Sequence, residues 1–437
     1  MIYNSLRPPR KNCGGLIKGE YMMSENALNL NEIRKKYEEL KGLGLKLDMS
    51  RGKPDTAQLD LSIPMLHTLD DNNFICENGM DVRNYGEFKG IPEVRRLFAE
   101  IFGVPAEQVL AGGSSSINMI SDALKRCFIN GPMEGFTPWS KLEKIKFICP
   151  VPGYDWHFHI CDTYGIEMLP VVTREDGPDM DEVERLAKDP DVRGMICVPM
   201  YSNPTGFTYS YETVERLAAM ETAAPDFRLI WDNAYCMHHL YDGDRDELAN
   251  IYEACLRHGT EDRVLMFTST SKITFAGGGV CAMAASPANI AFAADLIRYQ
   301  LVCYDKVNQL RHTRFLPDKK AVEAHMRKHA DIVRPKFELV LQTLERELGG
   351  LELVRWGRPK GGYFICFEAP EGCAKKIVRL CEEAGVKLTP AGATYPHGLD
   401  PKDSIIRIAP TYPPTDELRQ ALEVFTTAVK LAAAERI

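Results

Sequence analysis

The amino-acid sequence predicts an α/β protein with a large, mostly parallel, seven-stranded sheet domain covered by helices and a smaller α+β domain. Seven short apolar runs alternate with amphipathic helical stretches between residues 108 and 285. Continuous apolar strands with helices between them are typical of a parallel sheet that is buried on both faces. Beyond residue 318 the chain mixes strands with amphipathic helices, and 437 residues are enough for two packed domains.

Each predicted element has its own signal. Residues 29–43 have helical periodicity, and a second helix is predicted over residues 91–103, where Pro92 occupies the first turn. The predicted strands of the large sheet are residues 108–113, 144–150, 167–172, 194–200, 228–234, 263–269 and 279–285. A long helical region follows over residues 287–348, interrupted near residues 311–317. The C-terminal part has predicted strands at 361–369 and 404–410 and predicted helices at 373–385 and 415–436.

These elements divide the chain into four predicted parts. Residues 1–23 are expected to be a flexible tail, because they are rich in Pro and Gly and lack the apolar core of a signal peptide. A natural start at Met22 or Met23 is the alternative explanation. The other parts are an N-terminal segment that packs with the small domain, the large cofactor-binding domain and the small domain, at residues 24–65, 66–317 and 318–437.

Charge and composition exclude several classes of protein. With a net charge of −8, the chain is not expected to bind nucleic acid or an acidic membrane. No apolar run approaches ~18 residues, so no transmembrane helix is expected. The thirteen cysteines form no C-x-x-C pair and indicate reduced thiols in a cytoplasmic protein. The histidine pairs His157/His159 and His238/His239 lack further ligands at zinc-site spacing, so no metal site is predicted.

Chemically useful side chains follow the ends of the predicted strands, where ligands bind in open α/β sheets. Gly113, Ser114 and Ser115 lie between the first strand and a helix, and such a turn can bind phosphate through its backbone N–H groups. A plain serine helix cap explains the same three residues. Tyr154 follows the second strand, where its ring could cover a planar ligand or pack as an ordinary interior aromatic.

Three later strand ends carry an amide, an acid and a lysine. Asn203 precedes Pro204, which favours an extended backbone at Asn203, although a turn built from Asn, Pro and Gly explains the motif as well. Asp232 ends an apolar strand, where a carboxylate needs either a cationic partner or a helix to cap. Lys272 lies among hydroxyl side chains, where shelter from water would help it lose its proton and become a nucleophile. A surface lysine in a loop is the alternative.

The combination of these groups on successive strand ends is more informative than any one of them. Together with the phenol of Tyr235, they are the groups that pyridoxal 5′-phosphate (PLP) requires. The motifs RGKPD, NYG, GGSSS, PGY, NPTG, DNAY, TSK and RIAP occur in this order across residues 30–430. In these motifs the sequence resembles the class I aminotransferases, which are PLP-dependent transferases of fold-type I. The stretches RGKPDTAQLDLS, GGSSSINM, SKITFAGGGV and NQLRHTRF more specifically resemble the subgroup Ic aspartate aminotransferases of bacteria.

The resemblance implies a catalytic or cofactor-binding role for each strand-end residue. Lys272 would form the internal aldimine, a Schiff base with PLP, and would move protons as general base and acid. Asp232 would pair with the pyridinium nitrogen and keep the ring protonated. Tyr235 and Asn203 would hydrogen-bond the phenolic oxygen of the cofactor, and Tyr154 would stack on its ring.

The resemblance also implies how the phosphate and the substrate are held. The implied phosphate-binding residues of the chain are Gly113, Ser114, Ser115 and Ser269. Tyr85, in the NYG motif, matches a tyrosine that reaches the phosphate of the neighbouring subunit, so a homodimer with active sites at the interface is implied. Arg407 matches the arginine that binds the substrate α-carboxylate with a bidentate fork, and Gly52 matches a glycine near that carboxylate.

One residue of the family pattern is absent from this chain. The family carries a phosphate-binding arginine about eight residues after the lysine, and this position is Val280, preceded by three glycines. The cations that could replace it are Arg51, Lys53, Arg311 and Arg314. Arg311 or Arg314 could instead bind the distal carboxylate of a dicarboxylic substrate, or both could be ordinary surface arginines of a helix.

The function predicted from these motifs is transamination with PLP, in which aspartate donates its amino group to 2-oxoglutarate. A PLP-dependent lyase or decarboxylase on the same scaffold is an alternative, because the core residues do not determine the reaction. A non-catalytic PLP-sensing module of a transcription regulator is a further alternative. Such regulators carry a DNA-binding domain of ~60 residues ahead of this fold, whereas only a short tail precedes the first predicted helix here.

Overall fold

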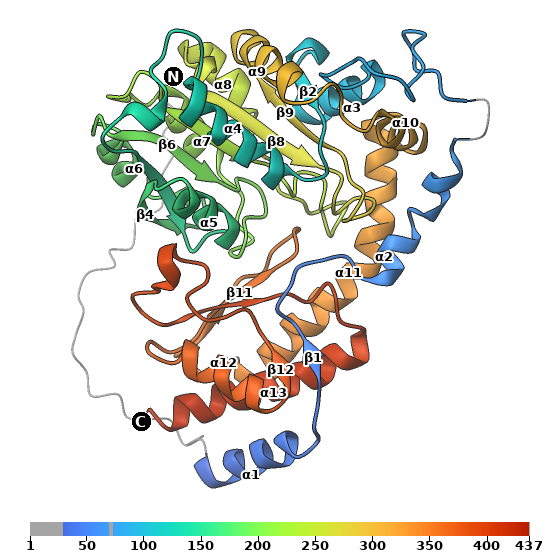
Figure 1. Ribbon diagram of the computed structural model, residues 1–437. Coiled ribbons are helices and arrows are strands. Elements are labelled where there is room, and N and C mark those ends of the chain that lie inside the picture. The colour runs from blue at the N-terminus through green and yellow to red at the C-terminus, as the bar shows by residue number, and fades with distance from the viewer. Residues whose placement is uncertain (1–28, 70–72, 437) are drawn as a thin grey trace, which may run out of the picture.

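The computed structural model describes residues 29–69 and 73–436, so the predicted tail at residues 1–23 lies outside the described part. Figure 1 shows two lobes, one built around a large sheet and one around a small sheet with long helices. Helix α11 (Lys319–Leu348) runs from the first lobe into the second. Several of the predicted site residues line a cavity to which both lobes contribute.

The large sheet has eight strands in the order β2-β9-β8-β7-β6-β3-β4-β5. Its strands are β2 (Val109–Ala111), β3 (Lys146–Val151), β4 (Glu167–Arg174), β5 (Gly177–Pro178), β6 (Val192–Cys197), β7 (Arg228–Asp232), β8 (Val264–Ser269) and β9 (Cys281–Ala285). Neighbours from β8 across to β4 pair in parallel, whereas β9 is antiparallel to both β8 and β2. All seven predicted strands are therefore present. The eighth, β5, is a two-residue edge strand paired antiparallel with β4, and it is too short to give a periodic sequence signal.

Helices cover both faces of this sheet, which explains the continuous apolar strands. They are α3 (Pro92–Phe102), α4 (Ser116–Asn130), α5 (Asp155–Thr163), α6 (Met180–Leu186), α7 (Tyr211–Ala219), α8 (Ile251–His258), α9 (Pro287–Gln300) and α10 (Lys306–Phe315). On β6, Met195 packs into one core with α3, α7 and α8, while the next residue, Ile196, packs into another with α4, α5 and α9. Successive strand residues point to opposite faces, so both faces need apolar side chains.

The described part of the small lobe contains two sheets and four helices of ten or more residues. The first sheet pairs β1 (Leu47–Asp48) with β12 (Val386–Lys387) in parallel. The second is antiparallel, in the order β10 (Arg355–Trp356), β11 (Ile365–Glu368), β13 (Ile405–Ile408). The helices of this lobe besides α11 are α1 (Leu30–Lys41), α12 (Ala374–Glu383) and α13 (Thr415–Ala434).

Residues from both ends of the chain form the core of the small lobe. Tyr37 and Met49 pack in one cluster with Phe337, Phe367 and Phe425. The remaining short helices of the described chain are α2 (Thr56–Asp60), η1 (Ile63–His67), η2 (Ala106–Gln108), η3 (Trp139–Lys141), η4 (Glu261–Arg263) and η5 (Pro396–Gly398). The division of the chain into domains at residues 66 and 318 stays a prediction.

Two further expectations concern the chain as a whole. Within residues 29–69 and 73–436, none of the helices combines the length and the apolar character that a membrane span needs. All twelve cysteines of the described part are free thiols, and nine of them are buried. In this part of the chain, no disulfide contradicts the reduced state that the cysteine spacing predicts.

Candidate active site

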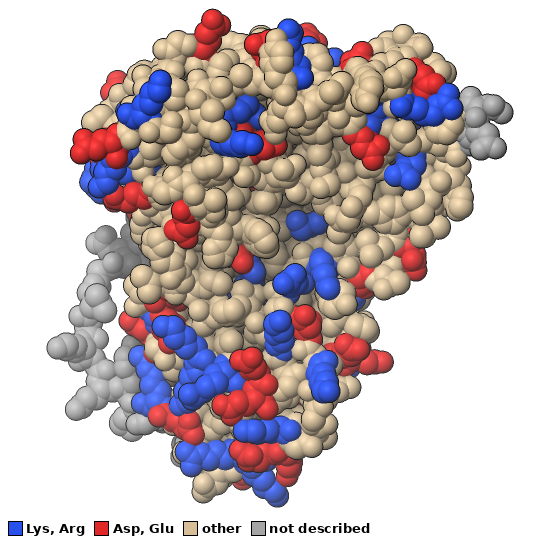
Figure 2. Space-filling model, viewed as in Figure 1, with Lys and Arg blue, Asp and Glu red and all other residues tan. Residues whose placement is uncertain are grey.

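The carboxyl ends of the parallel strands bring the predicted residues to one edge of the large sheet. Asp232 is the last residue of β7 and Ser269 the last residue of β8, and these two strands are neighbours. A cavity of about 700 Å³ opens beside this edge, and its lining includes Tyr154, Tyr235 and Lys272. Small-lobe residues close its other side. Figure 2 shows the surface hollowed between the two lobes, with Lys and Arg side chains gathered around the hollow.

Asp232 is held by a histidine and keeps one oxygen free of partners. Its Oδ2 lies 3.0 Å from Nε2 of His157, and both side chains are buried. Its Oδ1 is buried and has no hydrogen-bond partner among the described residues. No helix begins directly after it, since α8 starts at Ile251, so the helix-cap explanation of this acid does not hold. A buried carboxylate oxygen in this state is suited to an N–H donor that carries positive charge.

Tyr154 packs against the histidine of this pair, at the start of helix α5. It is the N-terminal boundary residue of α5, and its ring meets that of His157 edge to face at 5.0 Å between centroids. Burial, helped by the nearby carboxylates of Asp232 and Asp155, raises the pKa of the Tyr154 phenol. The ring is therefore a neutral aromatic surface facing the cavity.

Lys272 has the environment that a nucleophilic amine needs. Its Nζ lies 5.1 Å from the centroid of the Tyr235 ring, and both residues line the cavity. Burial lowers the pKa of Lys272 below the ordinary lysine value, although the Asp232 carboxylate offsets part of this effect. Burial raises the pKa of Tyr235, so its phenol stays protonated. The surface-loop explanation of this lysine is thus excluded, because the side chain faces a shared cavity.

Arg407 anchors the opposite wall of the cavity. Its Nη1 donates to Oδ1 of Asp155 at 3.0 Å and to Oδ1 of Asn203 at 3.1 Å, and its Nε donates to Oγ1 of Thr389 at 3.3 Å. The guanidinium centre lies 4.9 Å from the centroid of the Phe364 ring. This planar, buried cation is suited to binding a carboxylate. The amide nitrogen of Asn203 is buried without a partner among the described residues.

Gly52 is required by the packing of this arginine. A Cβ added at Gly52 would lie 2.3 Å from Cζ of Phe364, the ring that also stacks on Arg407. Any larger residue would therefore displace the ring from its present position over the guanidinium. Gly52, which is predicted to lie near the substrate carboxylate, thus packs against Phe364, the ring that stacks on Arg407. All three residues line the cavity.

The glycine–serine turn has the geometry of an anion-binding turn. Gly113 has φ +72°, a left-handed conformation that glycine tolerates best. Ser115 caps α4 by accepting a bond from the backbone N–H of Asn118 at 3.4 Å. Ser271 connects this turn to the lysine loop, because its Oγ donates to the carbonyl of Ser114 at 2.7 Å and lies 3.0 Å from Oγ of Ser269. The predicted phosphate residues are therefore brought together around the start of a helix.

Gly279 lies against this turn, whereas the position expected for the missing arginine points elsewhere. Val280 is buried in the large-lobe core and does not face the turn. A Cβ at Gly279 would lie 2.8 Å from the carbonyl oxygen of Ser114 and 3.0 Å from the nitrogen of Ser271. No side chain fits at Gly279 without displacing the turn.

Helix α10 places an arginine behind this glycine loop. Asn308 donates from Nδ2 to the carbonyls of Gly278 and Gly279 at 3.0 and 3.2 Å. Arg311 donates from Nη2 to Oδ1 of Asn308 at 2.9 Å, and its Nε is buried without a partner among the described residues. Arg314, one turn on, donates to the carbonyl of Ile75 at 3.4 Å.

The cations that line the cavity are different from the two arginines considered for the distal carboxylate. Neither Arg311 nor Arg314 is among the described residues that line it. Arg51, Lys53 and Lys387 do line it, and none of the three forms an ion pair with another described residue. Lys53 instead lies 3.7 Å from the centroid of the Tyr412 ring. Free positive charge is therefore available at the small-lobe side of the cavity.

Tyr85 lies apart from the other site residues of this chain. It is 75% exposed, in a loop where its backbone N–H donates to Oδ1 of Asn84 at 2.8 Å. The buried Lys306 donates to the carbonyl of Asn84 at 2.5 Å and so fixes the loop on α10. The role of Tyr85 at the neighbouring subunit stays a prediction.

Several residues of the site were not predicted from the sequence. His157 follows Tyr154 by three positions on one helix, a spacing that places both on the same face and could have identified it. Asp155, Thr389 and Phe364 carry no motif that would have marked them. Within residues 29–69 and 73–436, no three or more His, Cys, Asp or Glu side chains are grouped so that they could hold a metal ion.

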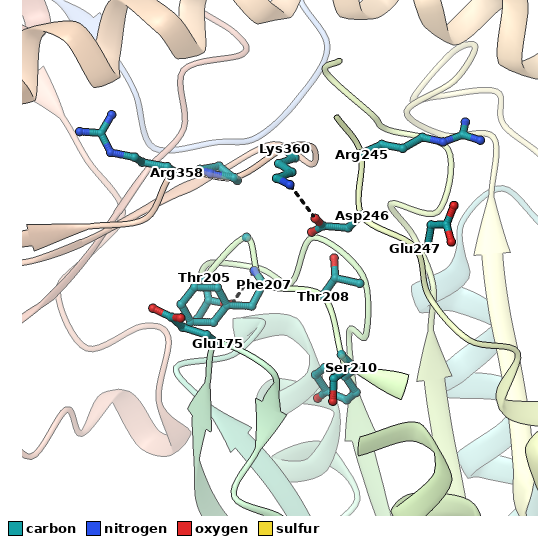
Figure 3. A pocket seen from close by; sticks show the side chains of 13 residues that line it. Glu175, Thr205, Phe207, Thr208, Ser210, Arg245, Asp246, Glu247, Arg358 and Lys360 are labelled. Atoms are coloured by element: carbon teal, nitrogen blue, oxygen red, sulfur yellow. Dashed lines mark hydrogen bonds and ion pairs between the residues drawn. The ribbon is translucent and has the colours of Figure 1, made fainter. Parts of the chain in front are cut away.

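A second cavity, of about 460 Å³, lies outside this site. Its lining includes Thr205 and Thr208, in the loop that follows Asn203, and Lys360. Figure 3 shows that Arg358 and Arg245 extend to opposite sides, away from Thr208, while Lys360 pairs with Asp246. The charges around this cavity are mixed and none of the predicted site residues lines it, so it is not the reaction site.

Comparison with known proteins gives a consistent result across the chain. Residues 22–437 match the model of one protein family, described as aspartate amino-transferase. An aspartate aminotransferase of Corynebacterium glutamicum is 46% identical over 404 residues, which cover 92% of this chain and 93% of the relative. A putative aminotransferase of Mycolicibacterium smegmatis is 44% identical over 417 residues, which cover 94% and 97%.

Solved structures agree with the sequence comparison. The crystal structure of an aspartate transaminase from Corynebacterium glutamicum superposes with a TM-score of 0.91 at 45% identity, covering 94% of this chain and 96% of that one. An α-aminoadipate aminotransferase of Thermus thermophilus, solved with N-(5′-phosphopyridoxyl)-L-leucine, gives a TM-score of 0.73 at 22% identity, covering 92% and 95%. This second likeness shows the fold alone. The predicted fold class is confirmed.

Proposed function

The chain belongs to the aspartate amino-transferase family, and from this premise we propose that it transfers the amino group of aspartate to 2-oxoglutarate with PLP as its cofactor. The family match confirms the aminotransferase identity that the motifs predicted. Aminotransferases of this fold family use PLP. The choice of aspartate rests on the name of a relative that is 46% identical over most of both chains.

The observation that carries the proposal is the unpartnered oxygen of Asp232 near Lys272. Oδ1 of Asp232 is buried without a hydrogen-bond partner among the described residues, and its charge affects the pKa of Lys272. PLP has both groups that this pair requires: a ring N–H for the carboxylate and an aldehyde for the amine. The unpartnered amide nitrogen of Asn203 and the phenol of Tyr235 would hold the phenolic oxygen of the ring. The residues therefore fit the cofactor.

The residues of the chain divide the work of transamination between them. PLP supplies an electron sink that stabilises negative charge at the substrate Cα when it is bound. Asp232, supported by His157, would keep the proton on the ring nitrogen. Arg407 would hold the substrate α-carboxylate and so orient Cα. Lys272 would take the proton from Cα with its Nζ and return it at the cofactor carbon, a role that its lowered pKa favours.

The phosphate would be held mainly by backbone N–H groups and hydroxyls. The supporting geometry is the Gly113–Ser115 turn at the start of α4, with Ser269 and Ser271 beside it. We assign the missing positive charge to Arg311, because it is bonded to Asn308, which holds the glycine loop on this turn. Its unpartnered Nε supports this assignment.

A dicarboxylic substrate suits the charges of the cavity. Once Lys272 and Arg407 are assigned to the cofactor and the α-carboxylate, Arg51, Lys53 and Lys387 remain on the small-lobe side. The cavity lining has two acids, of which Asp155 is paired with Arg407. The three cations therefore outnumber the remaining acid, Glu382. A second carboxylate on the substrate would meet this excess of positive charge.

We also propose a homodimer with Tyr85 reaching the phosphate of the neighbouring subunit. Its support is the family resemblance of the NYG motif and the 75% exposure of Tyr85 in a single chain. Mixing a Tyr85→Phe chain with a Lys272→Ala chain would test it, since hybrid dimers would recover one intact site. Recovery of activity above that of either variant alone is expected, and a monomeric enzyme would show none. The cytoplasmic location stays a prediction.

A spectroscopic and kinetic experiment tests the proposed function. The purified protein is expected to show the visible absorbance of covalently bound PLP, and aspartate and glutamate are expected to bleach it, whereas alanine is not. Glutamate should then form from 2-oxoglutarate in step with the loss of aspartate. Release of ammonia or carbon dioxide instead would identify a lyase or a decarboxylase. A spectrum that responds to no amino acid would leave only the PLP-sensing alternative.

A further inference from the structure

Asp155 is a carboxylate inside the cavity that binds the candidate substrate arginine. Its Oδ1 lies 3.0 Å from Nη1 of Arg407, and 18% of its side chain is exposed against 8% for the arginine. Asp155 is the first residue of α5, directly after Tyr154. It is therefore attached to the wall that would cover the cofactor, while Arg407 comes from β13 of the small lobe.

The hydrogen bonds of Arg407 leave no unoccupied fork for an incoming carboxylate. A bidentate bond uses Nη2 together with either Nη1 or Nε. Nη1 is already bonded to Asp155 and Asn203, and Nε to Thr389. Two of these partners are neutral, and Asp155 alone carries a charge of the same sign as the substrate carboxylate.

Thr389 is fixed by a second hydrogen bond and Asn203 by its burial, whereas the Asp155 side chain is partly exposed. Thr389 is buried, and its hydroxyl donates to the carbonyl of Ser50 at 2.8 Å. Asn203 is 1% exposed. Arg407 is the only residue of the described chain to which the Asp155 carboxylate is hydrogen-bonded or ion-paired. Asp155 is thus the partner that a substrate can displace by rotation of one short side chain into the cavity.

We propose that Asp155 is an internal competitor of the substrate carboxylate for Arg407, and that it sets the substrate affinity of the enzyme. This inference rests on the proposed function, in which Arg407 binds the α-carboxylate. A neighbouring like charge disfavours a second carboxylate, so Asp155 raises KM. Asp155 takes back Arg407 as each product leaves, because the product keeps its α-carboxylate. No bond is made or broken in this exchange.

An isosteric substitution separates this role from a structural one. Asp155→Asn keeps the size and the acceptor oxygen of the side chain but removes its charge. Asp162→Asn is the matched control, because Asp162 is an exposed acid of the same helix that pairs with His397 outside the cavity. Both variants would be studied as PLP-loaded enzymes, with KM and kcat for aspartate, the inhibition constant of succinate and the dissociation constant of PLP as readouts.

The expected result is a change in carboxylate affinity alone. Asp155→Asn should lower KM for aspartate and the inhibition constant of succinate by about tenfold, the smallest effect usual for a like charge at this distance. The value of kcat and the affinity for PLP should stay within about twofold, and Asp162→Asn should change none of these quantities. If KM and the succinate constant are unchanged or rise, Asp155 positions Arg407 or stabilises α5, and the proposal is overturned.

A second variant and a binding measurement that does not depend on activity complete the test. If Asp155→Asn does not fold, Asp155→Ser, which also favours a helix start, should give the same tightening of succinate binding. An unaltered enzyme that binds PLP but transaminates no amino acid would refute the proposed function. In that case succinate binding would still test the role of Asp155. Equal succinate affinity of the unaltered enzyme and the Asp155→Asn variant would refute the competition between Asp155 and a bound carboxylate, whatever the reaction is.

Discussion

His157 holds Asp232 by a single hydrogen bond, with Nε2 of the histidine 3.0 Å from Oδ2 of the acid, and both side chains are buried. The two oxygens of the carboxylate therefore have different surroundings. Oδ2 is fixed by the protein, while Oδ1 has no partner among the described residues. The histidine orients the acid so that its second oxygen can meet a ring N–H.

Removal of either member of this pair should lower turnover by different amounts. Asp232→Asn should reduce kcat about 100- to 1,000-fold. The substitution removes the fixed carboxylate charge that would keep the ring nitrogen protonated while negative charge develops in the transition state. His157→Gln should reduce kcat only about tenfold, because the carboxylate stays and loses one charge-assisted hydrogen bond. Steady-state kinetics measures both effects. His258→Gln is the control, since His258 is exposed on α8 and does not line the cavity, and an equal effect there would contradict a role specific to His157.

Lys272→Met should abolish transamination but stabilise the PLP-free protein. Burial lowers the folded-state pKa of Lys272 below its ordinary value of 10.5. The unfolded chain then binds more protons than the folded chain between these two pKa values, so the lysine destabilises the fold at neutral pH and this penalty disappears as the pH rises toward 10.5. Methionine removes the charge and keeps the length of the side chain.

The measurement is Tm of the PLP-free proteins as a function of pH. The difference between Lys272→Met and the unaltered chain should be largest at neutral pH and should shrink as the pH approaches 10.5. Lys46→Met, at an exposed position without an ion pair among the described residues, should show no such dependence. A variant Tm below that of the unaltered protein at neutral pH would contradict the prediction.

Many of these relationships follow from local sequence. Asp232 and Ser269 end apolar strands, and neighbouring parallel strands bring their carboxyl ends to one edge, so their proximity could be predicted. The seven main strands were recognised because each is an apolar run that is buried on both faces. The two-residue strand at Gly177–Pro178 could not be recognised, because two residues have no period.

Contacts between distant segments could not be predicted in the same way. Arg407 and Asp155 are 252 positions apart, and their bond depends on how the two lobes pack. A count of eight residues from the lysine led to Val280, whereas Gly279 is the residue that lies on the phosphate turn. A shift of one residue in a glycine-rich loop is invisible in a single sequence, because glycine permits many backbone paths.

Arg311→Gln should weaken PLP binding by about tenfold to a hundredfold. Its bond to Asn308 places positive charge behind the glycine loop, and the loss of one charged partner of a phosphate is in the range of about 1.5–3 kcal/mol. Glutamine keeps a donor for Asn308, so the loop itself should not move. The dissociation constant of PLP, measured by fluorescence titration of the PLP-free enzyme, is the readout.

Arg314→Gln serves as the comparison, because Arg314 lies on the same helix and donates to Ile75 instead. Its PLP affinity should stay within about twofold of that of the unaltered enzyme. Equal affinities for all three proteins would show that backbone N–H groups and hydroxyls suffice for the phosphate. A large effect of Arg314→Gln on KM for aspartate alone would instead support its role toward the distal carboxylate.

Gly52→Ala should raise KM for aspartate without a comparable loss of PLP. The added Cβ would lie 2.3 Å from Cζ of Phe364, so the ring must shift, and it lies over the Arg407 guanidinium. A ring forced off this face leaves the arginine less well positioned, and we expect KM to rise about tenfold, equivalent to about 1.4 kcal/mol of lost binding. Gly350→Ala is the control, since a Cβ there meets no heavy atom within 4 Å. An unchanged KM in Gly52→Ala would show that Phe364 does not position the arginine.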